Sequence, residues 1–93
     1  MKKCLKIMFS GDIPENFLKK SVQKYAQDLE IEGTAQHISS DQGVKIIACG
    51  LIETVEELLD VIHKEAAKIG IEDIQIEPFI KEKDYRGVFR IIE

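Results

Sequence analysis

The sequence is poor in the residues and patterns that mark several protein classes. It has two prolines, six glycines and no tryptophan among 93 residues. With 44% hydrophobic and 32% charged residues, this composition excludes collagen-like, low-complexity and disordered chains. No apolar run approaches the roughly 20 residues that span a membrane. We therefore expect a single domain over residues 1–93, large enough to bury a core without a metal or a dense set of disulfides.

The first twelve residues, MKKCLKIMFSGD, superficially resemble a secretory signal. However, Lys6 interrupts the apolar stretch and no cleavage site of small residues follows. We therefore expect a cytoplasmic protein with no membrane partner.

Charge is distributed unevenly along the chain. The net charge is −4, but residues 1–24 carry six lysines against two acids (6 − 2 = +4) and residues 25–93 carry seven basic against fifteen acidic residues (7 − 15 = −8). The acidic total argues against a general nucleic-acid binder. The basic first quarter is either ordinary surface scatter or the surroundings of a local anion site.

Hydrophobic periodicity predicts alternating strands and helices. Strict alternation over residues 3–9 predicts a strand, and apolar spacing of three and four residues predicts helices from Phe17 onward and over residues 53–69, with Gly70 as C-cap. The remaining predicted elements are a strand at 34–39, a turn at 40–43, strands at 44–49 and 72–80, a polar loop at 81–86 and a last strand at 88–92. This β-α-β-β-α-β-β order predicts an α+β ferredoxin-like sandwich, with two helices on one face of a mainly antiparallel sheet.

Two functions found in proteins of this architecture require residues that this sequence lacks. A heavy-metal carrier needs a cysteine pair in the first loop, and Gly11–Asn16 contains none. An RNA-binding version stacks bases on aromatic side chains of the central strands, where only Phe9 is available, on the inward parity. We expect no metal, no cofactor and no nucleic acid.

Most of the chain resembles an acylphosphatase. Family members carry G-x-V-x-G-V-x-F-R after the first strand, then G-W-V-x-N, a D-G turn and V-x-V-x-A-x-G. This sequence follows that frame without a gap as GDIPENFLK, VQKYAQDLEIEG, TAQH and SSDQGVKIIACG, and closes with VFRII. The resemblance implies the ferredoxin-like fold and, in an active member, hydrolysis of the carboxyl-phosphate bond of small acyl phosphates.

The resemblance also implies roles for individual positions. Lys19 stands where the family has the arginine that pairs with phosphate, and His37 stands where it has the asparagine that holds the attacking water. Backbone N–H groups of a glycine-rich loop cradle the phosphate. The loop positions here are Gly11, Asp12, Ile13, Pro14, Glu15, Asn16, Phe17 and Leu18.

The loop departs from the family pattern in ways that oppose phosphate. Glu15 replaces the middle glycine, Pro14 lacks an N–H donor, and Asp12 adds a second negative charge. The run Asp12-Ile13-Pro14-Glu15 also reads as a helix N-terminus capped by its own aspartate. We therefore expect a catalytically degenerate acylphosphatase whose anion site is closed by Asp12. Two alternatives are an ordinary loop of other shape, and an active hydrolase using Lys19 and His37.

The two cysteines form a second candidate site. Cys4 begins the first strand and Cys49 ends the third, and both have outward parity. Since these strands neighbour each other in the predicted sheet, the two thiols should face each other on its open side. They are either reduced thiols, as is usual in the cytoplasm, or a redox-dependent disulfide. The same open face, with Lys6, Met8, Lys45 and Ile47, is a candidate surface for an unknown protein partner.

Overall fold

A computed structural model describes residues 2–14, 16–38, 43–71, 73–79 and 87–92 of the chain. Its elements are β1 (Lys2–Ser10), η1 (Leu18–Gln23, a π-helix), α1 (Lys24–Asp28), β2 (Glu32–Ile38), β3 (Gly43–Leu51), α2 (Ile52–Lys68), β4 (Gln75–Pro78) and β5 (Phe89–Ile92). Most of the predicted 40–43 turn and the whole 81–86 loop lie outside the described residues. No helix within those ranges has the length and apolar character needed to cross a membrane.

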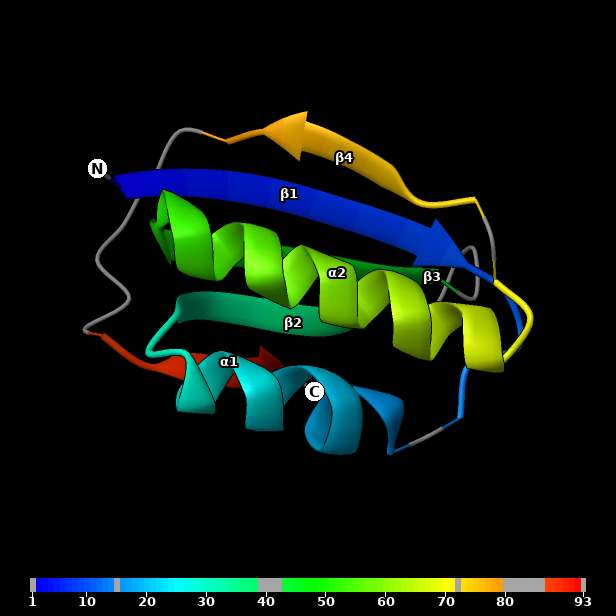
Figure 1. Ribbon diagram of the computed structural model, residues 1–93. Helices are drawn as coiled ribbons and strands as arrows, with labels where there is room; N and C mark the ends of the chain where they lie inside the picture. The colour runs from blue at the N-terminus through cyan, green and yellow to red at the C-terminus, as the bar shows by residue number, and fades with distance from the viewer. Residues whose placement is uncertain (1, 15, 39–42, 72, 80–86, 93) are drawn as a thin grey trace.

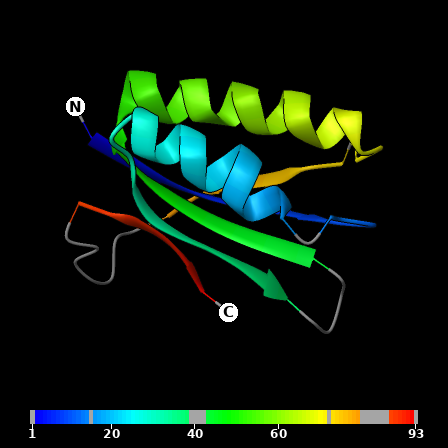
Figure 2. The same ribbon diagram turned by 90° about the horizontal axis from the view of Figure 1, so that it is seen from below.

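The strands form one five-stranded sheet in the order β4-β1-β3-β2-β5. Three of the neighbouring pairs are antiparallel, and β2 pairs with β5 in parallel. The helices η1, α1 and α2 lie together on one face, and no described helix or strand covers the other face of the sheet (Figures 1 and 2). This confirms the predicted ferredoxin-like α+β arrangement.

The core lies between the helices and the sheet, as the alternation of β1 predicts. Leu5, Ile7 and Phe9 of β1 are buried against the helix layer. The helix α2 contributes residues at helical spacing, namely Val55, Leu58, Ile62 and Ala66. Burying these side chains contributes roughly 1.5–3 kcal/mol for each large aliphatic or aromatic group. The sheet register is therefore fixed, because a slip by one residue would turn the apolar set of β1 toward water.

A polar link joins the two helical segments above the core. The Ser21 hydroxyl of η1 donates a 3.2 Å hydrogen bond to the Glu65 carboxylate of α2, and Lys68 lies 2.8 Å from the same side chain. The hydrogen bond from Lys68 lowers the pKa of Glu65, and the bond from Ser21 acts in the same direction. The Ser21–Glu65 bond thus links η1, which carries Lys19, to α2.

The helix α1 is followed by Glu30, a residue type that is unfavourable in the left-handed conformation it adopts there. Glu30 N–H bonds to Gln27 C=O, and Ile31 N–H bonds to Ala26 C=O, which is the Schellman pattern of hydrogen bonds. Glu30 has φ +57°. At the end of α2 the same pattern places Gly70 at the equivalent position with φ +84°. A side chain in this left-handed region costs about 1–2 kcal/mol, which glycine avoids.

We expect Glu30→Gly to raise the free energy of unfolding by about 0.5–1 kcal/mol, after the larger entropy of the unfolded glycine chain is subtracted. Urea denaturation of the purified variant measures the change. The matched control is Glu30→Ala, which removes the same charge but keeps the Cβ. A glycine variant no more stable than the alanine variant would contradict this account of the helix end.

Candidate functional site

Three elements bring the predicted site together at one end of the sandwich. β1 ends there at Ser10, η1 begins there at Leu18, and β2 ends there at Ile38 (Figures 1 and 2). η1 also contacts β2 directly. Lys19 is the second residue of η1 and His37 is the next-to-last residue of β2. The two side chains predicted to act together therefore lie at the same end, beside the segment that starts at Gly11.

Both side chains are exposed and available to a ligand. Lys19 and His37 are solvent-exposed, whereas their neighbours Leu18 and Ala35 are buried. His37 has the parity of Ala35, so it belongs to the face of β2 that carries the helices. Within the described ranges, neither the ammonium of Lys19 nor the imidazole of His37 has a hydrogen bond or an ion pair.

The predicted self-capping of the loop by Asp12 is wrong. The helical segment begins at Leu18 with Phe17 as N-cap, five residues beyond Asp12, and no side-chain hydrogen bond caps it. Instead a turn closed by the 3.1 Å bond from Phe17 N–H to the Pro14 carbonyl precedes the helix. Phe17 is buried edge-to-face against Phe9, with ring centroids 5.9 Å apart. The burial of this aromatic pair, worth more than one cap, sets where the helix starts.

The Asp12 carboxylate instead stays in solvent beside the loop. Asp12 is exposed, and no described group donates a hydrogen bond to its carboxylate or forms an ion pair with it. Its negative charge is therefore not neutralised by any described group. Glu15, the second acid of this segment, lies outside the described residues.

At two positions where the chain shares a glycine with the family pattern, the structure gives a steric reason for glycine. Gly11 and Gly33 both have φ +146°, a conformation that side chains rarely adopt. A Cβ on Gly33 would overlap the carbonyl oxygen of Ile47 on the neighbouring strand β3. The close pairing of β2 with β3, which places His37 two strands away from β1, therefore depends on glycine at position 33.

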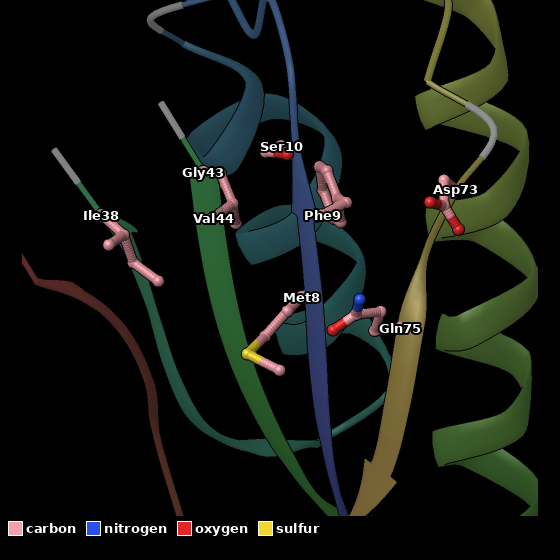
Figure 3. Close-up of a pocket in the computed structure, with 8 residues that line it drawn as sticks. All are labelled: Met8, Phe9, Ser10, Ile38, Gly43, Val44, Asp73 and Gln75. Atoms are coloured by element: carbon pink, nitrogen blue, oxygen red, sulfur yellow. The ribbon is translucent and has the colours of Figure 1, made fainter. Parts of the chain in front are cut away.

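A cavity of 490 Å³ lies at the same end of the sheet (Figure 3). Ser10 and Gly43 belong to its wall, together with Met8, Phe9, Ile38, Val44, Asp73 and Gln75. Among the described residues, Lys19 and His37 do not line it, and the one charged side chain in its wall is the acid Asp73. The described part of the wall therefore offers no positive side chain to a phosphate, and this cavity was not foreseen from the sequence. In the described part of the chain no three His, Cys, Asp or Glu side chains are grouped as a metal site would require.

The cysteines are joined on the open face of the sheet. Cys4 and Cys49 are directly opposed in the β1–β3 register, as the sequence predicts, with Cα atoms 4.1 Å apart. They form a disulfide, so the expectation of reduced thiols that follows from a cytoplasmic location does not hold for this structure. Direct opposition on two central strands is the reason, since it brings the two sulfur atoms within bonding range. Ile47 and Phe79 pack beside the bond.

The family model described as Acylphosphatase matches residues 5–91. An acylphosphatase of Coxiella burnetii (strain RSA 493 / Nine Mile phase I) is 25% identical over 88 residues, which cover 95% of this chain and 90% of the relative.

Two solved acylphosphatase structures are among those that share the fold. A structure of an acylphosphatase from Coxiella burnetii superposes with a TM-score of 0.81 at 23% identity, covering 98% of this chain and 93% of that one. The crystal structure of acylphosphatase from Bacillus subtilis gives a TM-score of 0.79 at 16% identity, with both chains covered completely.

Proposed function

Because the chain belongs to the acylphosphatase family, we propose that it is a catalytically degenerate member, which attracts small anions weakly through Lys19 and does not turn over acyl phosphates. The observation that carries this proposal is the exposed carboxylate of Asp12, which has no hydrogen bond or ion pair within the described residues and belongs to the loop where the family holds phosphate. Its charge repels an anionic substrate in the position where family catalysis depends on positive charge and N–H donors.

Electrostatics give the size of this effect. Two like unit charges 4 Å apart repel by about 1 kcal/mol in water and by about 4 kcal/mol near a partly shielded protein surface. A phosphate dianion experiences more than one such unit. Lys19 offsets part of this repulsion, but its ammonium is a single mobile charge and lacks the fork of two parallel donors that an arginine presents to phosphate.

The replacement at the water-binding position weakens catalysis further. An asparagine amide offers a donor and an acceptor in fixed geometry, whereas a neutral imidazole offers one of each on opposite sides of a ring and becomes a double donor when protonated. A water held in line with the scissile bond needs defined geometry more than it needs a base, because acyl phosphates have a good leaving group. His37 therefore substitutes poorly for the family residue.

One specific observation favours a second candidate, an active acylphosphatase. The helix start at Phe17 has no side-chain cap, and Lys19 and His37 are exposed at the same end without described partners. An anion approaching this end meets the exposed side chains of both Lys19 and His37. In this alternative Lys19 binds phosphate and His37 positions the water.

Phosphate affinity tests the role assigned to Asp12. We expect the unaltered protein to bind inorganic phosphate with a dissociation constant above about 10 mM. Asp12→Asn should tighten binding roughly tenfold at low salt, because it removes about 1–2 kcal/mol of repulsion. The measurement is the titration of backbone amide shifts of residues 16–19 with phosphate.

The matched control is Asp28→Asn, which makes the same charge change at the exposed far end of α1. We expect it to leave phosphate affinity unchanged. Sub-millimolar binding by the unaltered protein, or equal affinities for the two variants, would contradict the proposal.

A further inference from the structure

The end of the sandwich opposite the candidate anion site holds a second cavity, of 430 Å³. It is lined by both cysteines of the disulfide and by the lysines that start β1, so its wall includes Lys2, Lys3, Cys4, Glu30, Cys49 and Leu51. We propose that the Cys4–Cys49 disulfide is a thiol–disulfide exchange site, and that this cavity admits a small thiol bearing carboxylates, such as a cysteine-containing peptide. This inference does not depend on the proposed function, because it concerns other residues and another reaction.

The two cysteines are unequally exposed. Cys4 is half-buried, whereas Cys49 is 4% exposed and packs with Ile47 and Phe79. Because Cys4 is the more exposed of the two residues and lines the cavity, we expect an incoming thiol to attack its Sγ. Attack on the more accessible sulfur is the faster of the two possible reactions.

The backbone hydrogen bonds between β1 and β3 keep the two strands paired when the disulfide breaks. The Cys4 carbonyl accepts a 3.1 Å hydrogen bond from Phe79 N–H, so the polar backbone groups of Cys4 point toward the β4 side and not toward β3. Cys4 and Cys49 are therefore a non-hydrogen-bonded pair of the antiparallel β1–β3 ladder. The ladder bonds on either side do not involve these residues, and cleavage of the disulfide breaks none of them.

The charges around the cavity set the preferred thiol. Lys2 and Lys3 are exposed, and neither has a hydrogen bond or an ion pair within the described residues. Lys6, the next lysine on the face of Cys4, is instead paired with Glu77 at 3.2 Å. The wall also carries Glu30 and Glu32, and the Glu32 carboxylate accepts a bond from Gly87 N–H. Lys2, which has the parity of Cys4, and Lys3 both line the cavity, so we expect it to favour a thiol with carboxylates, and Glu30 can accept an ammonium group of the same ligand.

The reaction balances with two thiols as the reductant. The first thiolate attacks Sγ of Cys4, a new sulfur–sulfur bond forms, the Cys4–Cys49 bond breaks, and Cys49 leaves as a thiolate that takes up a proton. A second thiolate attacks the ligand sulfur of the mixed disulfide and releases the Cys4 thiolate. The products are the protein dithiol and one oxidised ligand disulfide, with two electrons transferred to the protein.

Thiols of opposite charge test the proposal. The oxidised protein is incubated with reduced glutathione or with cysteamine at equal thiolate concentration, free thiols are trapped by alkylation, and loss of the protein disulfide is followed by mass spectrometry. We expect glutathione to react roughly tenfold faster than cysteamine at low salt, with the difference shrinking as salt is added. Any trapped adduct should map to Cys4.

Charge variants make the test specific to the cavity. The double variant Lys2→Ala and Lys3→Ala should lose the preference for glutathione. The control Lys45→Ala lies on the same face of the sheet as Cys49 but outside the cavity, and it should leave the preference unchanged. Equal rates for the two thiols, adducts on Cys49, or a disulfide that resists glutathione but yields to dithiothreitol would each overturn the proposal.

Discussion

We expect reduction of the Cys4–Cys49 disulfide to lower the free energy of unfolding by about 4 kcal/mol. The two cysteines are 45 residues apart in the sequence, and closing a loop of that length removes about 13–14 cal/mol/K of entropy from the unfolded chain. Small domains have net stabilities of about 5–15 kcal/mol, so this single bond accounts for a large share. For a chain of this size the thermal midpoint should fall by roughly 20 °C.

Paired melts with and without dithiothreitol measure this effect, with mass spectrometry confirming the redox state of each sample. The matched control is the double variant Cys4→Ser and Cys49→Ser, whose midpoint should not respond to reductant. If the oxidised and reduced proteins melt at the same temperature, the disulfide does not stabilise the fold as proposed.

The second large effect concerns the family motif. A variant combining Glu15→Gly, Lys19→Arg and His37→Asn should hydrolyse a simple acyl phosphate at least about 100-fold faster than the unaltered protein. Arginine restores a bidentate charge-assisted contact worth about 1.5–3 kcal/mol, and a single positioned donor at a reacting centre is commonly worth 10²–10³-fold in rate. The loop glycine removes one negative charge at the same time. Release of inorganic phosphate from acetyl phosphate measures the rate.

Lys20→Arg is the matched control for the restored arginine, since Lys20 is the exposed neighbour of Lys19 on η1 and makes the same side-chain change one position away. It should give no gain. A folded triple variant without added activity would show that the three positions are not what limits catalysis.

The fold was predictable because the alternation in the strands and the spacing in the helices favour the same arrangement. Strict alternation in β1 places Leu5, Ile7 and Phe9 in the core, and helical spacing in α2 places Leu58 and Ile62 there. The same parity argument predicted that Cys4 and Cys49 face each other. Strand register follows from these apolar sets, so local and global preferences agree.

The details of the site were not predictable, because tertiary packing overrode local signals. The Asp12-Ile13-Pro14-Glu15 run favours a helix N-terminus locally, but burial of Phe17 against Phe9 moves the helix start to Leu18. The π-helical turn that carries Lys19 has no sequence signature at a period of 3.6 residues. Formation of the disulfide depends on redox conditions and on close backbone approach, neither of which residue spacing reports.

The hydrolysis of acetyl phosphate by the purified, unaltered protein tests the central claim most directly. It is measured beside Lys19→Ala and His37→Ala, with the Coxiella burnetii acylphosphatase as the positive control. If the site is degenerate, phosphate release by all three forms of this chain equals that of buffer alone. Catalysed turnover by the unaltered protein that falls when either Lys19 or His37 is removed would contradict the account and establish the active alternative.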